Sequence, residues 1–228
     1  MLSATLLGKE TQTVARPANS QSDSTEVPEV VITRLPQYIR VLNSLLDAGV
    51  DVVSSQQLGE QLQVTPAQIR KDLSYLGRFG KQGRGYNVSY LATELKQILG
   101  LNRRWNVCLV GVGRLGRAIL SYPGFVPEGF EIVAAFETDA AIVGQTISGL
   151  RIQPIEELDR TVTRQNISIG IIAVPSAVAQ KVMRRLTECG IKAILNYAPV
   201  YPQVPPQVKV RNVDPVLSLQ SMTYYLVN

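Results

Sequence analysis

Three glycines at a fixed spacing are the residues of this chain most suited to chemistry. Gly111, Gly113 and Gly116 form a Gly-x-Gly-x-x-Gly pattern between the apolar run 107–110 and a helical run over 114–120. In such a turn the first glycine makes the bend, the second lets the backbone touch a pyrophosphate, and the third lets the helix pack closely. The N–H groups and positive dipole end of the helix hold phosphates. The pattern predicts a dinucleotide site, with an unliganded βα turn as the alternative.

An acidic residue follows this pattern at the end of the next apolar strand, 130–136. Glu137 lies 26 residues after Gly111, near the spacing of about 20 at which a carboxylate bonds the adenosine ribose. A carboxylate there repels a 2′-phosphate and favours NAD(H) over NADP(H), whereas the nearby Arg114 and Arg117 weaken that preference. The alternative is a solvated acid at a strand end.

The positive charge of the chain gathers in one short stretch. The formal net charge is +5, and between Thr65 and Tyr86 five basic residues accompany a single acid, Asp72. A basic second helix and a glycine-rich basic wing suit the major groove and the DNA backbone or minor groove. The alternative is a helical domain with a solvated basic face. The candidate DNA-contacting residues are Ser55, Gln68, Arg70, Lys71, Ser74, Tyr75, Arg78, Lys81, Arg84 and Tyr86.

The N-terminal part supplies the elements that would position these basic side chains. Apolar residues at helical spacing predict a helix over 35–48. Thr33 is its expected cap, Pro36 falls in its first turn, and Gly49 is its expected stop.

Two capping-box patterns then predict the helix–turn–helix itself. Ser54–Gln57 opens one helix, and Thr65–Gln68 opens the second, which runs to about Leu76. Tyr86–Val88 is the expected returning strand of the wing, and a further helix is expected over 89–99.

The C-terminal part alternates strands with helices and predicts a doubly wound parallel sheet. Ligands of such sheets bind at the C-terminal strand ends, where Gly111, Glu137, Val174 and Asn196 fall. A last helix, 214–226, carries an apolar stripe that requires a partner surface. The other expected elements are strands over 167–174, 191–195 and 208–213 and a helix over 176–188.

Composition bounds the remaining possibilities. The chain is 45% hydrophobic and 18% charged and has no histidine, which removes the commonest metal ligand and general base. Cys108 and Cys189 fit neither a metal nor a disulfide pattern and are expected as small core residues. No apolar run approaches the length of a membrane span or a secretory signal. We therefore expect a cytoplasmic α/β protein without a metal.

The expected organisation has four parts. Residues 1–29 are a disordered tail, 30–100 a winged-helix DNA-binding domain, 101–213 a Rossmann NAD(H)-binding domain, and 214–228 a C-terminal dimerisation helix.

Several motifs together resemble the Rex family of redox-sensing transcriptional repressors. The similarity runs from about Leu35 to the C-terminus and includes the glycine pattern. Its other motifs are Arg70–Gly77, Gly80, Gly83, Gly85–Tyr86, Tyr122–Phe125, Phe136–Asp139, Gly190–Asn196, Ala198–Val200 and Asn212–Asp214.

The resemblance implies a homodimer that binds double-stranded operator DNA when NADH is scarce and releases it when NADH binds. It implies a C-terminal helix exchanged across the dimer, where Pro215 departs from the bulky apolar residue usual in the family. It also implies polar coupling among Arg40, Tyr122 and Asp214. The implied NADH/NAD⁺-binding residues are Gly111, Val112, Gly113, Arg114, Leu115, Gly116, Tyr122, Glu137, Asp139, Ala173, Val174, Pro175, Asn196, Tyr197, Ala198 and Pro199.

Two other functions stay open from the residues alone. An NAD-dependent oxidoreductase needs a proton donor beside the nicotinamide, and the chain has no histidine and no recognisable catalytic lysine or tyrosine motif. A constitutive DNA-binding protein with a vestigial nucleotide fold is the other. We expect a regulator without catalytic residues.

Overall fold

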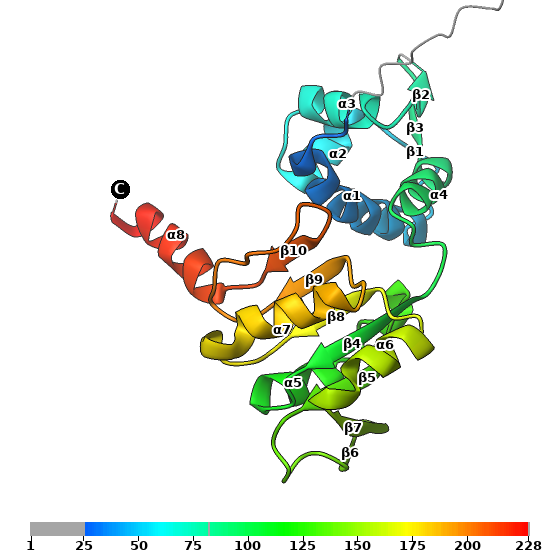
Figure 1. The fold of residues 1–228 in the computed structure, drawn as a ribbon. Helices are drawn as coiled ribbons and strands as arrows, with labels where there is room; N and C mark the ends of the chain where they lie inside the picture. The colour runs from blue at the N-terminus through cyan, green and yellow to red at the C-terminus, as the bar shows by residue number, and fades with distance from the viewer. Residues whose placement is uncertain (1–25, 82, 228) are drawn as a thin grey trace, which may run out of the picture. The chain divides into compact units, whose positions relative to one another are not determined.

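The computed structural model describes residues 26–81 and 83–227, which form two compact units divided between Thr93 and Glu94 (Figure 1). Most of the tail predicted for residues 1–29 lies outside the described residues, but Glu29 already begins a helix. None of the described helices is both long and apolar enough to cross a membrane.

The first unit combines helices with a small sheet, and its last helix runs past the division. Its elements are α1 (Glu29–Asp47), β1 (Val52–Val53), α2 (Ser55–Leu62), α3 (Pro66–Ser74), β2 (Gly80–Lys81), β3 (Gly85–Asn87) and α4 (Val88–Ile98).

Helix α1 begins earlier than predicted. It starts at Glu29, so Thr33 is not its cap; the Thr33 hydroxyl donates to the Glu29 carbonyl oxygen at 2.9 Å. Pro36 consequently lies inside the helix rather than in its first turn. A proline there removes one hydrogen bond, but burial of Val31 and Leu35 on the same face stabilises the upstream turns.

The helix–turn–helix forms as predicted, with one difference in its caps. The full capping box at α2 is present, since Ser54 Oγ accepts from the Gln57 nitrogen and the Ser54 nitrogen donates to the Gln57 side chain. At α3, Thr65 caps the Gln68 nitrogen at 3.2 Å, but the Gln68 side chain bonds elsewhere. The second box is therefore only half formed.

The wing is a three-stranded antiparallel sheet in the order β1-β3-β2. Val53 of β1 and Gly80 of β2 both pair with Tyr86 of β3. Gly85 has φ +72°, and a β-carbon there would lie 2.7 Å from the Val53 carbonyl oxygen, so this crossing needs glycine. The two-residue strand β1 was not predicted because so short a run carries no periodicity.

The second unit is built on a seven-stranded sheet in the order β10-β9-β8-β4-β5-β7-β6. All neighbours are parallel except β6 and β7. Its elements are β4 (Trp105–Val110), α5 (Arg114–Leu120), η1 (Val126–Glu128), β5 (Phe130–Glu137), β6 (Thr146–Ile147), β7 (Leu150–Pro154), η2 (Ile155–Glu157), α6 (Leu158–Arg164), β8 (Ile169–Ile172), α7 (Ser176–Glu188), β9 (Ala193–Asn196), β10 (Lys209–Asn212) and α8 (Pro215–Val227).

This order confirms the predicted doubly wound sheet. With the antiparallel edge strand β6 set aside, it is the 3-2-1-4-5-6 arrangement of dinucleotide-binding domains. Helix α7 has the predicted bounds, whereas the strand expected over 167–174 is shorter, Ile169–Ile172. Strands β6 and β7 and helix α6 were not predicted.

Alternate residues of the central strands build two cores on opposite faces of the sheet. Val110 and Phe136 pack with the buried residues of α6 and α7. Leu109 and Ala135 pack with Ile119 of α5. The α5 face is less completely covered, because Leu195 and Tyr197 of the β9 region are only partly buried.

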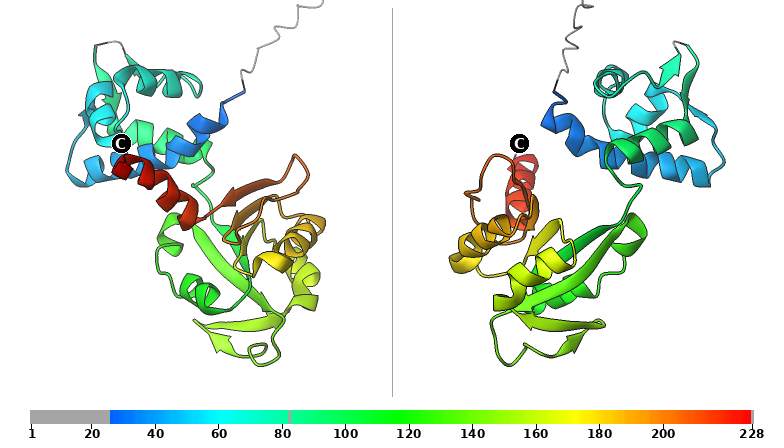
Figure 2. Two further views of the ribbon diagram at one scale, coloured as in Figure 1. Left: turned by 90° about the vertical axis from the view of Figure 1, so that its left-hand side faces the viewer. Right: turned by 45° about the vertical axis from the view of Figure 1, so that its right-hand side comes forward.

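Helix α8 projects from the end of β10 and does not lie on the sheet (Figure 2). Pro215 is its first residue and Asp214 its cap, since Asp214 Oδ1 accepts from the Val216 nitrogen at 2.9 Å. None of its residues is buried. Its exposed large apolar side chains are Val216, Leu217, Leu219, Met222, Tyr224, Tyr225, Leu226 and Val227.

Candidate functional site

The three glycines of the turn between β4 and α5 lie in different surroundings. Gly111 has φ +96°, and a β-carbon there would lie 2.5 Å from the Ala173 carbonyl oxygen. A β-carbon at Gly116 would overlap the carbonyl oxygen of Gly111. At Gly113 a β-carbon would meet no atom within 4 Å. The fold itself therefore requires the first and third glycines, while the second faces open space.

The carboxylate of Glu137 is folded back onto this turn. Its Oε2 accepts from the Val112 nitrogen at 2.7 Å, and its Oε1 accepts from the Thr138 and Asp139 nitrogens at 2.6 and 3.3 Å. Burial opposes ionisation, but these N–H groups and the Thr138 hydroxyl hold the pKa of Glu137 below its ordinary value. The acid is charged and links β5 to the glycine turn.

The same bond occupies one of the backbone N–H groups of the glycine turn. The Val112 N–H donates to Glu137, and the Val112 side chain is buried. The first N–H groups of a helix have no partner within it. The backbone of Gly113, Arg114 and Leu115, before and at the start of α5, carries the remaining donors.

A cavity of about 420 Å³ lies at the C-terminal ends of β4, β5 and β8. Six of the residues predicted to bind the cofactor line it: Gly111, Gly113, Glu137, Ala173, Val174 and Pro175. Apolar residues of η2 and α7 complete its walls. Two cations of α7, Lys181 and Arg185, also line it and were missed; their one-turn spacing on the helix that follows Pro175 was the available signal.

The Asn196 side chain bonds groups of its own domain. Its side chain is fully buried, and its Nδ2 donates to the Ala198 carbonyl at 2.8 Å and to Asn212 Oδ1 at 2.9 Å. Its Oδ1 accepts from the Ala198 nitrogen at 3.0 Å. In this structure the amide therefore shapes the turn.

The remaining residues predicted to bind the cofactor lie outside the lining of this cavity. Ala198 is buried, Tyr197 half-buried and Pro199 exposed, and none of them lines the cavity. Asp139 is exposed, and its Oδ1 accepts from the Ala141 nitrogen at 2.9 Å. Tyr122 is exposed and packs edge-on against Phe125, with ring centroids 5.2 Å apart.

The two cysteines are not alike. Cys108 is buried in the sheet, as predicted. Cys189 is only half-buried, and its thiol donates to Asp159 Oδ1 at 2.7 Å. Burial, then this carboxylate, raises the pKa of Cys189 to about 12, so the thiol stays protonated and is a poor nucleophile.

In the first unit, a second cavity of about 710 Å³ lies between α3 and the wing. Arg70 Nη1 donates to Ser55 Oγ across it at 3.1 Å. Five predicted DNA-contacting residues line it: Ser55, Arg70, Ser74, Arg78 and Tyr86.

The remaining predicted DNA-contacting residues divide into two groups. Lys71 and Arg84 are exposed, and Tyr75 is half-buried at the end of α3; the side chain of Lys81 lies outside the described residues. Gln68 is turned inward, and its Nε2 donates to the buried carboxylate of Asp72 at 2.6 Å. In this structure the Gln68 amide nitrogen is therefore engaged within the domain.

A winged helix and a doubly wound domain with a glycine turn, in one chain, define a DNA-binding regulator that carries a nucleotide site. Two family models match the chain. One is described as "Putative DNA-binding protein N-terminus" and matches residues 26–74; the other is "CoA binding domain" and matches residues 102–200.

Similar proteins narrow this class. The redox-sensing transcriptional repressor Rex of Chloroflexus aggregans is 54% identical over 203 residues, which cover 89% of this chain and 96% of that protein. Rex of Roseiflexus sp. is 53% identical over 201 residues, covering 88% and 91%. The chain belongs to the Rex family of redox-sensing transcriptional repressors.

Two solved structures extend the similarity to the fold. The Rex-family repressor RSP in complex with β-NAD⁺ and operator DNA has a TM-score of 0.84 and 40% identity, covering 89% of this chain and 93% of that one. RSP in complex with β-NADH has a TM-score of 0.80 and 38% identity, covering 89% and 95%.

Proposed function

We propose that this repressor binds NADH and NAD⁺ at the C-terminal edge of its parallel sheet and operator DNA through α3 and the wing. It holds the operator when NADH is scarce and releases it when NADH binds. The observation that carries this proposal is the 40% identity, over 89% of the chain, to a repressor solved with NAD⁺ and operator DNA. The open backbone at Gly113 and the cavity between α3 and the wing support it.

The cofactor would lie across the glycine turn. The N–H groups of Gly113, Arg114 and Leu115 would hold the pyrophosphate, and Gly111 and Gly116 would shape the turn beneath it. Glu137 and Asp139 would face the adenosine ribose. The nicotinamide half would lie toward Ala173, Val174, Pro175, Tyr197, Ala198 and Pro199.

The charge of the nicotinamide ring offers a basis for sensing. The reduced ring is neutral and the oxidised ring is a cation. An apolar wall at Ala198 and Pro199 would disfavour the cation, because burying an unpaired charge costs several kcal/mol. NADH can shift the repressor between two states only by its difference in affinity for them.

The acting form would be a homodimer. The exposed apolar residues of α8 and the partly covered α5 face of the sheet support this, since apolar surface of this kind marks association sites. A dimer presents two α3 helices to two half-sites, so a change in their spacing would release DNA. The family resemblance implies that three residues, Arg40, Tyr122 and Asp214, couple the subunits. We propose that they have this role here.

The proposal assigns no catalytic residue and no metal to the chain; the described residues hold no cluster of three candidate metal ligands. Calorimetry with NADH and an assay of NADH oxidation with common carbonyl substrates test it together. We expect NADH binding without turnover. Absence of binding would favour a constitutive DNA-binding protein, and sustained turnover would favour an oxidoreductase.

A further inference from the structure

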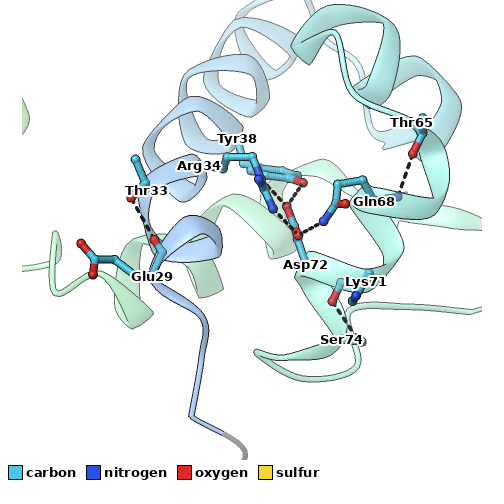
Figure 3. Close-up of polar contacts among 9 residues, drawn as sticks. All are labelled: Glu29, Thr33, Arg34, Tyr38, Thr65, Gln68, Lys71, Asp72 and Ser74. Carbon is cyan, nitrogen blue, oxygen red and sulfur yellow. Dashed lines mark hydrogen bonds and ion pairs between the residues drawn. The ribbon is translucent and has the colours of Figure 1, made fainter.

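A buried carboxylate fastens the DNA-reading helix α3 to α1 (Figure 3). Arg34 of α1 donates from Nε to Asp72 Oδ2 and from Nη2 to Asp72 Oδ1, both at 2.7 Å. Tyr38 of α1 donates its hydroxyl to Oδ2 at 2.9 Å, and Gln68 of α3 donates to Oδ1 at 2.6 Å. We call Arg34, Tyr38, Gln68 and Asp72 the Asp72 clamp.

The clamp satisfies its carboxylate completely. Asp72 is 0% exposed, and each of its oxygens accepts two hydrogen bonds, which uses the acceptor capacity of the group. The Arg34 fork is bidentate, so it fixes direction as well as distance. Arg34 and Tyr38 lie one turn apart on α1, so both donate to the carboxylate from the same face of that helix.

Stability alone does not account for this arrangement. Apolar residues of similar volume commonly replace a buried ion pair without loss of stability. Ile69 and Leu73 already give α3 an apolar face, but apolar contacts are not directional. The clamp therefore adds what those contacts lack, a fixed rotation of α3 about its own axis.

That rotation decides where the outer residues of α3 point. At 3.6 residues per turn, a residue two positions away lies nearly opposite on the helix. Arg70 and Ser74 are each two positions from Asp72, so they face away from the clamp. Both line the cavity between α3 and the wing.

We propose that the Asp72 clamp sets the angle at which α3 presents Arg70 and Ser74, and that Arg34 and Tyr38 thereby determine discrimination between operator and other DNA. This inference rests on the proposed function. Arg34 and Tyr38 act through Asp72, so they are positioning residues. General affinity for DNA depends on total charge and should not need the clamp.

The test uses a full-length variant without the clamp, R34M/Y38F/D72L, which leaves the net charge unchanged. Its dissociation constants are measured for the operator duplex of the RSP complex and for a scrambled duplex of the same composition. We expect wild-type thermal stability, scrambled-duplex affinity within about twofold, and a fall of about tenfold or more in the operator-to-scrambled ratio. R104M/E131Q, which removes an exposed ion pair and also leaves the net charge unchanged, is the control and should change neither dissociation constant.

A folded triple variant with the wild-type ratio would overturn the inference. If the triple variant does not fold, R34K decides, because lysine keeps the charge but loses the bidentate fork. A folded R34K variant with a reduced ratio would support the clamp, and one with the wild-type ratio would overturn it. Wild-type protein that does not distinguish the two duplexes would instead overturn the proposed function.

Discussion

The carboxylate of Glu137 accepts a 2.7 Å hydrogen bond from the backbone nitrogen of Val112, which joins the end of β5 to the glycine turn of β4 and α5. One acid thus holds the shape of the turn and also places a negative charge beside the cavity that the turn lines. Its two roles separate when the charge is removed and the shape is kept.

Glu137→Gln makes that separation. The amide oxygen can still accept from Val112, but the amide nitrogen then faces the Thr138 and Asp139 N–H groups that Oε1 accepted from. The expected loss of stability is therefore about 1–3 kcal/mol. Without the negative charge the site should repel a 2′-phosphate less, and the preference for NADH over NADPH should shrink by about tenfold. Calorimetric titration with both nucleotides measures this, with Glu156→Gln, another acid lining the cavity, as the control. An unchanged preference would remove Glu137 from cofactor selection.

The second and third glycines of the turn should respond differently to the same change. Gly113→Ala places a methyl group in open space, so stability should stay nearly constant, while a pyrophosphate can no longer approach the backbone. NADH binding should weaken at least about tenfold, and the operator should stay bound in its presence. Gly116→Ala is the matched variant.

Gly116→Ala drives its methyl group into the Gly111 carbonyl and should lower the unfolding temperature. Thermal scans and NADH titrations of both variants separate the two effects. Wild-type NADH affinity in Gly113→Ala would contradict the placing of the pyrophosphate.

Asp214 caps α8, so its charge must be tested apart from its cap. Asn is as good a cap as Asp; Asp214→Asn therefore preserves the bond to the Val216 nitrogen, whereas Asp214→Ala removes it. If Asp214 couples the subunits, both variants should need more NADH to release the operator, with the fold intact. If the Asp214→Asn variant releases the operator at the NADH concentration that the wild type needs, then Asp214 acts only as the cap of α8.

The Asp72 clamp should make stability depend on pH. Burial opposes ionisation of Asp72, but Arg34, Gln68 and Tyr38 hold its pKa below the ordinary value of 3.8. A lowered folded-state pKa stabilises the fold above that ordinary value, and the stabilisation is lost as pH falls through the lowered one.

Asp72→Asn tests this dependence, since it leaves Arg34 without its charged partner. The variant should be less stable than wild type by about 3–5 kcal/mol at neutral pH, and the difference should shrink below about pH 4. Denaturant unfolding from pH 7 to 3 measures it. A difference that stays constant over this range would mean that the carboxylate's charge does not stabilise the fold.

The sequence predicted the second unit well where proline and glycine residues mark the ends of its elements. Helix α7 has its predicted bounds because Pro175 precedes it and Gly190 follows closely. The glycine turn was predicted because its three positions impose local backbone requirements. Short elements without periodicity, such as β1 and α6, gave no such signal.

Side-chain contacts between distant residues were beyond prediction. Gln68 was expected to face DNA because it lies on α3 with the basic residues, but its partner Asp72 is itself held by Arg34, which lies 38 positions earlier. Asn196 was expected to face the cofactor, but it bonds Asn212 on the neighbouring strand β10. Periodicity gives the face of an element, and only the packed structure gives the partner.

The central claim is that the reduced cofactor, and not the oxidised one, releases the operator. Fluorescence anisotropy of a labelled operator duplex bound to the protein, titrated separately with NADH and with NAD⁺, tests it most directly. The anisotropy should fall with NADH at concentrations at which NAD⁺ leaves the complex bound. Equal release by the two nucleotides, or release by neither, would contradict the claim.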